Sequence, residues 1–191
     1  MQQPVQNFFT PEEYLLQEEK AEFKHEYYQG KIYAMAGASV NHTRITRNVL
    51  SLLNSSLKNN STCEAFMTDM RVWIEEKDLF TYPDILVVCS KLEFYPKRDD
   101  TISNPLLIIE VLSDSTKNYD RGEKFMFYRS IPSFSEYILI DQYSIHVEHF
   151  FKTPENHWML TEYKKMSDVV RFSKINFEIS LEDIYTSVEF K

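Results

Sequence analysis

The apolar segment Leu106–Leu112 constrains the fold of this chain more than any other feature, because one carboxylate interrupts it. A run that is apolar on both faces is typical of a strand in the middle of a covered sheet. Alternate side chains of a strand share a face, so Glu110 points to the same side as Ile108 and Leu112. An ionised carboxylate without a partner at such a position costs roughly several kcal/mol. The segment therefore predicts a positive group beside Glu110, either a structural Arg or Lys or a metal ion.

A second carboxylate, Asp84, stands directly after Pro83 at the start of another apolar segment, Pro83–Cys89. Taken alone, this Asp is typical of a turn in which its side chain caps a backbone amide. Together with Glu110 it indicates more, because two neighbouring central strands can place one carboxylate each on the same side of a sheet. Such a pair suits a hard cation, and Mg²⁺ commonly uses one or two protein carboxylates with waters and substrate phosphate. The backbone carbonyl of Val111 is a further candidate ligand.

A helix predicted at Lys117–Arg129 follows the strand that carries Glu110. Asp120, Lys124 and Tyr128 are spaced four residues apart, so they lie on one stripe of this helix. The plain interpretation is an exposed Asp–Lys pair, which is worth about a few tenths of a kcal/mol. Lys117 and Arg121 make the beginning of the helix positive, and free backbone amides at a helix N-terminus favour phosphate.

The rest of the chain predicts helices and strands within one domain, residues 1–191. Thr10 is suited to cap a first helix that runs to about Phe23, and Ser39 or Asn41 opens a second that runs to about Lys58 and is stopped by Asn59-Asn60-Ser61. The other predicted segments are a strand pair at Tyr27–Ala36, strands at Cys63–Phe66 and Met70–Glu75, a surface segment at Ser90–Ser103, a β-meander at Glu136–Asp141, Ile145–Phe151, Trp158–Lys164 and Val169–Ile179, and a helical turn at Leu181–Tyr185.

Charge and hydropathy limit the possible partners. The formal net charge is −8, which excludes affinity based on a large excess of positive charge, because nonspecific binding of nucleic acid needs Lys and Arg to neutralise phosphates. A nuclease is not excluded, since its active-site carboxylates add to the acidic count and bound cations reverse the local field. The N-terminus does not resemble a signal peptide and no apolar run is long enough to cross a bilayer, so we expect a cytoplasmic protein without a membrane partner.

The cysteines and most histidines carry little functional signal. Cys63 and Cys89 belong to no Cys-x-x-Cys pair, and we interpret them as small core residues, not as a disulfide or a zinc pair. His146 and His149 lie on opposite faces of a predicted strand, so they cannot chelate one metal together and are expected at the surface.

A set of ordered motifs covers nearly the whole chain and resembles the Uma-two family, whose members are described as endonucleases of the PD-(D/E)XK superfamily. The segments that carry the resemblance are Glu26-Tyr27-Tyr28-Gln29-Gly30-Lys31-Ile32-Tyr33, Gly37-Ala38-Ser39 with His42, Asp69-Met70-Arg71-Val72, Tyr82-Pro83-Asp84-Ile85-Leu86-Val87-Val88, Asn104-Pro105 with Leu106–Ser113, Ser115-Thr116, Tyr119-Asp120-Arg121-Gly122-Glu123-Lys124 and Glu136-Tyr137-Ile138-Leu139-Ile140-Asp141.

The resemblance implies an α/β (α+β) fold with a restriction-endonuclease-like core, in which helices flank a central mixed β-sheet and an antiparallel meander follows at the C-terminus. It implies Asp84 and Glu110 as metal-binding acids, Glu26 as an added acid, and Mg²⁺ as the metal, with Mn²⁺ as a substitute. The superfamily pattern Glu-x-Lys would put a lysine at position 112, where this chain has Leu112. In the Uma-two family, the resemblance implies that this lysine has moved to the following helix, at the position that matches Lys124.

The expected function is therefore magnesium-dependent hydrolysis of phosphodiester bonds, with DNA as the substrate by family analogy. Lys124 joins Asp84 and Glu110 as the expected catalytic residues, while Lys117, Arg121 and His42 are candidates for binding phosphate, and His42 is equally suited to a structural role. A homodimer is expected because cutting both strands of a duplex usually needs two sites. The alternative is a binding or scaffold protein that kept the nuclease fold without turnover, which the acidic charge favours. An enzyme of small phosphorylated metabolites is disfavoured, because the three glycines form no phosphate-binding loop.

Overall fold

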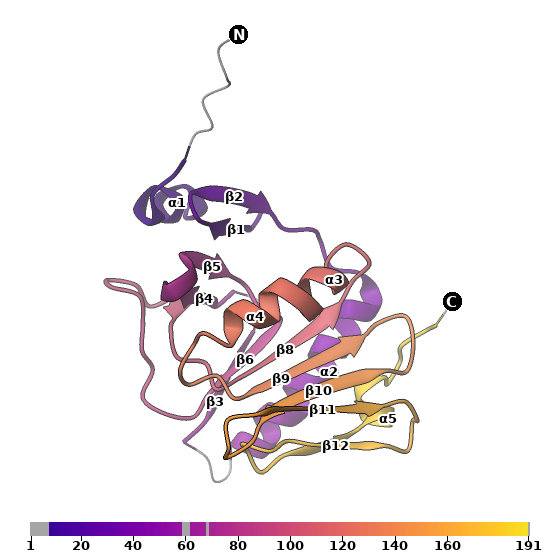
Figure 1. Cartoon of the computed structure of the whole chain (residues 1–191). Helices are drawn as coiled ribbons and strands as arrows, with labels where there is room; N and C mark the ends of the chain where they lie inside the picture. Colours follow the sequence, from indigo (N-terminus) through magenta and orange to yellow (C-terminus); the bar gives the residue numbers. More distant parts are fainter. Residues whose placement is uncertain (1–7, 59–61, 68, 191) are drawn as a thin grey trace.

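A six-stranded mixed sheet forms the centre of the computed structural model, which describes residues 8–58, 62–67 and 69–190 (Figure 1). Its order is β11-β10-β9-β8-β6-β3, and the pairing of β8 with β9 is parallel while the other pairings are antiparallel. The bounds are Glu64–Met67 for β3, Ile85–Val88 for β6, Leu107–Leu112 for β8, Glu136–Asp141 for β9, Val147–Lys152 for β10 and Trp158–Tyr163 for β11. The two apolar segments of the sequence are thus neighbouring central strands, as predicted.

A second sheet of five strands has the order β2-β1-β5-β4-β7. Its bounds are His25–Tyr28 for β1, Lys31–Ala34 for β2, Arg71–Ile74 for β4, Leu79–Thr81 for β5 and Thr101–Ile102 for β7. The sequence did not predict β5 and β7, because strands of two or three residues are too short to show a period of two. Thr101 and Ile102 are buried, so the prediction that Ser90–Ser103 is a surface segment was wrong at this end.

Helices cover both faces of the central sheet. In Figure 1, α2 (Val40–Leu57) runs behind the sheet, whereas α3 (Lys117–Tyr119) and α4 (Phe125–Tyr128) lie in front of it. Between α3 and α4 the chain makes a π-helical turn, η2 (Asp120–Lys124). Ser39 caps α2, and Thr10 caps α1 (Pro11–Glu18) through the predicted capping box, but α1 ends well before Phe23. Asn59-Asn60-Ser61, the predicted stop of α2, lies outside the described residues.

The alternation of side chains in β6 and β8 divides the core into two layers. Ile85, Val87, Ile109 and Val111 pack with α2 and the C-terminal elements in one cluster. Side chains of the opposite face, which include Leu86, Ile108 and Leu112, pack with residues of α4 in the other cluster. Glu110 shares this second face, so the helix that follows β8 covers it.

The C-terminal region follows the prediction in part. β9, β10 and β11 form the expected antiparallel meander, but the segment predicted as its fourth strand forms a separate hairpin of β12 (Val169–Arg171) and β13 (Glu178–Ser180). The short helix α5 (Leu181–Ile184) follows β13. Another short helix, η1 (Glu75–Lys77), lies between β4 and β5. None of the helices among the described residues has the length and hydropathy to cross a membrane.

Cys63 and Cys89 form a disulfide bond, and the prediction of two separate core residues was wrong. The antiparallel register of β3 and β6 pairs Glu64 with Val88, so the next pair outward is Cys63 and Cys89. A sequence separation of 26 residues hides this proximity from the sequence.

His149 is also not at the surface, as the sequence had suggested. It is buried, and its Nε2 lies 2.6 Å from Oε1 of buried Glu136 on the neighbouring strand β9. The Glu136 carboxylate also accepts hydrogen bonds from the backbone amides of Ser173 (2.7 Å) and Lys174 (3.2 Å). The pair therefore ties the loop between β12 and β13 to the central sheet.

Candidate active site

Asp84 and Glu110 lie side by side because of the register of their strands. β6 and β8 are antiparallel neighbours in which Ile85 pairs with Ile109, so Asp84, just before β6, comes next to Glu110. The backbone amide of Asp84 donates to Oε2 of Glu110 (3.3 Å), and the amide of Val111 donates to Oδ2 of Asp84 (2.7 Å). Each carboxylate is thus oriented by the backbone of the other strand.

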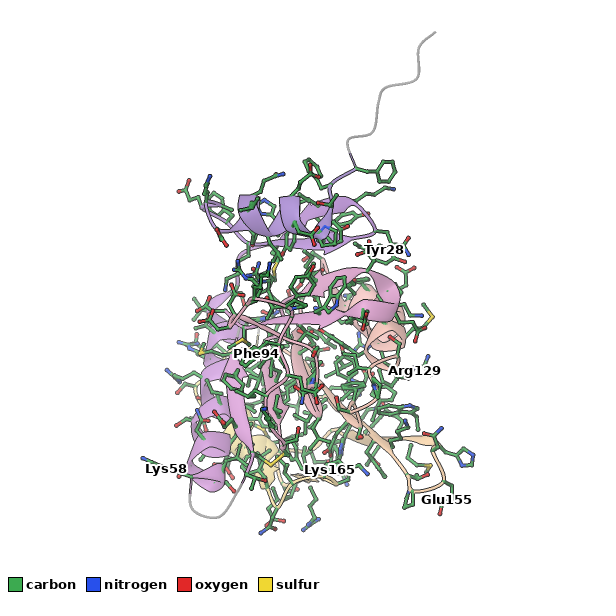
Figure 2. The ribbon with its side chains drawn as sticks, turned by 90° about the vertical axis from the view of Figure 1, so that its left-hand side faces the viewer. Tyr28, Lys58, Phe94, Arg129, Glu155 and Lys165 are labelled. Atoms are coloured by element: carbon green, nitrogen blue, oxygen red, sulfur yellow. A yellow bond between two sulfur atoms is a disulfide. The ribbon has the colours of Figure 1, made fainter. Side chains whose placement is uncertain are left out.

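Glu26 reaches the same place from the five-stranded sheet. Tyr27 of β1 pairs with Phe80 of β5, which puts Thr81 next to Glu26, and the Thr81 hydroxyl donates to Oε1 of Glu26. β5 ends at Thr81 and β6 begins at Ile85, so a very short connection joins the two sheets at the site. In Figure 2, Tyr28 of β1 lies toward one end of the molecule and Lys58, the residue after α2, lies at the other.

Lys124 joins the two groups of acids. Its Nζ lies 2.8 Å from Oε1 of Glu110, 3.5 Å from Oε1 of Glu26 and 3.6 Å from Oδ1 of Asp120. The side chains of Lys124 and Asp120 are 6% and 4% exposed, so the interpretation of an exposed Asp–Lys pair was wrong. Both residues belong to the π-helical turn η2, and such turns are frequent at functional sites.

Tyr128 and Thr81 also belong to the site, although sequence reasoning assigned neither of them a role. The hydroxyl of buried Tyr128 donates to Oε1 of Glu110 (3.1 Å), the oxygen that Lys124 also contacts. The four-residue spacing from Asp120 through Lys124 to Tyr128 was the available signal for Tyr128. Thr81 gave no signal, because the strand that holds it was not recognised.

Of the three candidate phosphate-binding residues, only His42 joins the acids. It lies in the first turn of α2, and its Nε2 is 3.0 Å from Oδ2 of Asp84. Lys117 pairs with Asp114 (2.8 Å) at the surface, and Arg121 pairs with Glu148 (2.7 Å). His42 therefore orients Asp84, whereas Lys117 and Arg121 lie outside the cluster.

The cluster holds more acidic than basic side chains. Burial raises the pKa of Glu110 to about 8, the charges of Asp84 and Asp120 act in the same direction, and Lys124 only partly opposes them. Burial also raises the pKa of Asp120. Burial acts to lower the pKa of Lys124, but the neighbouring acids, Glu110 first, keep it well above its ordinary value. The ammonium thus stays charged, and three acidic side chains lie beside it.

This donor set fits a hard divalent cation. Among the described residues no hydrogen bond engages Oδ1 of Asp84 or Oε2 of Glu26, and the ion-pair contacts of the two side chains are made through their other oxygens, so both atoms remain available as ligands. Within the same residues, no three His, Cys, Asp or Glu side chains are arranged to enclose a metal ion by themselves. Mg²⁺ does not need such an enclosure, because it keeps several waters and uses one or two carboxylates.

A mixed sheet between helices, with paired acids on adjacent central strands and a lysine over them, defines a nuclease-like fold of the restriction-endonuclease type. Residues 11–182 match the Uma2 (Uma-two) family, described as "Putative restriction endonuclease", and the chain belongs to this family.

The chain is also similar to two curated proteins and to a solved structure. Two proteins of Synechocystis sp., both described as uncharacterized, are 42% identical over 164 residues (86% of this chain, 92% of the relative) and 34% identical over 181 residues (95% and 93%). The fold is similar to the crystal structure of a putative nuclease belonging to DUF820 from Anabaena variabilis, with a TM-score of 0.70, 20% identity, and coverage of 93% of this chain and 98% of that one.

Proposed function

We propose that this protein is a magnesium-dependent endonuclease that hydrolyses phosphodiester bonds, with DNA as its substrate. The observation that carries the proposal is the convergence of Glu110 and Glu26 on the ammonium of Lys124, with Asp84 directly beside Glu110. Membership of the Uma2 family supports a nuclease-like function, and the metal and the DNA substrate are our additions.

Asp84 and Glu110 would hold Mg²⁺, for which Mn²⁺ can substitute, and Glu26 would close the site as an added acid or assist a second ion. When bound, the ion supplies a water of lowered pKa and offsets negative charge on the phosphate. His42 and the amide of Val111 both engage Oδ2 of Asp84, which leaves Oδ1 of the same carboxylate available. On Glu110, Tyr128 and Lys124 engage Oε1, while Oε2 faces the amide of Asp84.

Lys124 would act on the phosphate through its charge. Hydrolysis of a phosphodiester places extra negative charge on the phosphate oxygens, and an ammonium fixed beside them stabilises that charge. Burial strengthens the effect because water is excluded. The neighbouring acids keep the ammonium protonated at neutral pH, so Lys124 has no role as a base.

Contacts to the flanking phosphates must be local, because the net charge is −8. Lys117 and Arg121 are candidates, since both lie on the helical segment that carries Lys124 and are only partly covered. A homodimer would supply two such sites to one duplex. Light scattering of the purified protein, followed by comparison of nicked with linear product, tests this point.

Cleavage of supercoiled plasmid tests the proposed function. The wild type should nick plasmid with Mg²⁺ or Mn²⁺ and not in EDTA, and Asp84→Asn and Glu110→Gln should lose this activity. Glu182→Gln, on the first turn of α5, removes one carboxylate away from the cluster and serves as the control purified in the same way. No cleavage of plasmid, single-stranded DNA or RNA with either metal would contradict the proposal. Retention of DNA in a gel without cleavage would then favour a binding or scaffold protein.

A further inference from the structure

Asp120 is a buried acid that the proposed metal site does not use. Asp120 is 3% exposed, and its Oδ1 lies 3.6 Å from Nζ of Lys124 within the same π-helical turn. The hydroxyl of buried Tyr137, from β9 beneath the helix, donates to the backbone carbonyl of Asp120 (3.1 Å). Asp120 is therefore held firmly by the sheet and presents its carboxylate to the lysine.

Lys124 and a bound cation would both interact with the same carboxylates. The shortest contact of Nζ is to Glu110 (2.8 Å) and the next is to Glu26 (3.5 Å), and both are proposed metal ligands. Like charges repel strongly in a buried site, so a divalent ion beside Glu110 disfavours the ammonium at its present position. Among the three acids that Lys124 contacts, Asp120 is the one that is not a proposed ligand.

We propose that Asp120 is a positioning residue, which retains the Lys124 ammonium in the site when the metal ligands are occupied. The inference rests on the proposed metal-dependent function. It assigns the three acids around Lys124 to two tasks: Glu110 and Glu26 to the cation, and Asp120 to the lysine. Without Asp120, the acids of the described residues that still contact the ammonium are Glu110 and Glu26, so the ammonium competes with the cation for them.

A double-mutant cycle of Mn²⁺ affinity tests this division. Calorimetry would give the dissociation constants of the wild type, Asp120→Asn, Lys124→Met and the double variant. Removing a residue that supports a metal ligand from outside typically costs about 10- to 100-fold in metal affinity. We expect a loss of about 10-fold for Asp120→Asn in the wild type, and little change for the same substitution in Lys124→Met, where no ammonium competes.

A matched control separates positioning from plain electrostatics. Asp114→Asn removes one carboxylate from the loop before the same helical segment, where it pairs with Lys117 at the surface, and it should leave Mn²⁺ affinity unchanged. An equal loss for Asp120→Asn with and without Lys124 would mean that only its negative charge matters, and would overturn the inference. No loss in either background would do the same.

The outcome must not depend on one variant that fails to fold. Thermal unfolding in EDTA shows whether each variant is folded, and Asp120→Glu replaces Asp120→Asn in the cycle if the latter is not. This variant keeps the charge and displaces the carboxylate, so a loss that requires Lys124 is again expected. Failure of the wild type to bind Mn²⁺ at millimolar concentration would overturn the proposed function as well, whereas additive losses would overturn the role of Asp120 alone.

Discussion

Nζ of Lys124 lies 2.8 Å from Oε1 of Glu110, so the helical segment that follows β8 returns its ammonium to the carboxylate of that same strand. Leu112 lies two residues after Glu110 on the same face of β8, where it packs in the core. The lysine thus comes from the helix above, and position 112 is left to an apolar side chain.

Lys124→Met should lose about 10²–10³-fold in cleavage rate while it still binds Mn²⁺, because the lysine supplies charge and not ligation. Single-turnover cleavage at saturating Mn²⁺ measures the rate. Adding Leu112→Lys should restore part of the activity, since position 112 lies on the same face of β8 as Glu110. The same substitution in the wild type should give no gain and should destabilise, because it buries a second cation. Full activity of Lys124→Met would show that its ammonium serves only the ion pairs of the cluster.

Mg²⁺ or Mn²⁺ should stabilise the wild type against unfolding, because the ion binds the folded cluster of acids and not the unfolded chain. At about 100 times the dissociation constant, the gain is roughly 2.7 kcal/mol. Urea unfolding with and without the metal measures it. Asp84→Asn should lose most of the gain, so an equal effect of the metal on both proteins would contradict the proposed ligand.

The metal-free protein should become less stable as the pH rises from about 5 to about 8. Burial, with the charges of Asp84 and Asp120, raises the pKa of Glu110 from 4.5 to about 8. Within this range the unfolded chain loses the Glu110 proton while the folded protein keeps it, so the free energy of unfolding falls. Below the unfolded pKa the full contribution is present, and above the folded pKa it is lost.

Glu110→Gln removes this pH-dependent contribution to the free energy of unfolding. The stability of the variant relative to the wild type should therefore grow with pH and level off above about 8. Urea unfolding of both proteins in EDTA between pH 5 and pH 9 provides the comparison. Parallel pH profiles would show that Glu110 is already ionised in the folded protein at pH 5.

Reduction of the Cys63–Cys89 disulfide should lower stability without changing the cleavage rate. The bond closes a loop between residues with a sequence separation of 26, for which a cost of about 3 kcal/mol on reduction is expected. Cys89 follows the end of β6 opposite to Asp84, so the acids should keep their geometry. Cys63→Ser and Cys89→Ser should match the reduced wild type, and an unchanged urea midpoint on reduction would contradict the prediction.

The parts of the site that could be predicted are those with a strong local signal. A carboxylate inside the apolar strand β8 needs a positive partner, and this requirement alone pointed to Glu110 as an unusual residue. Asp84 became informative only together with Glu110, because their two apolar segments indicated neighbouring central strands. Lys124 could be chosen only through the family resemblance, because the spacing from Asp120 is equally typical of an exposed ion pair.

The remaining features depend on long-range register, which local patterns do not contain. Thr81 lies in a three-residue strand whose pairing with β1 brings it to Glu26. His149 appeared exposed because its partner Glu136 is on another strand, and Cys63 and Cys89 meet only through the pairing of β3 with β6. In each case the partner becomes visible only when the order of the strands is known.

The short connection Tyr82-Pro83-Asp84 between β5 and β6 makes the site intolerant of insertions at this point. Thr81 supports Glu26 in one sheet and Asp84 contacts Glu110 in the other, so the connection sets the spacing between the two halves of the site. One extra residue here would leave the ladder of each sheet intact and yet separate the acids. Homologous chains should therefore vary in length at the loop between β6 and β7 but keep a constant number of residues between these two positions.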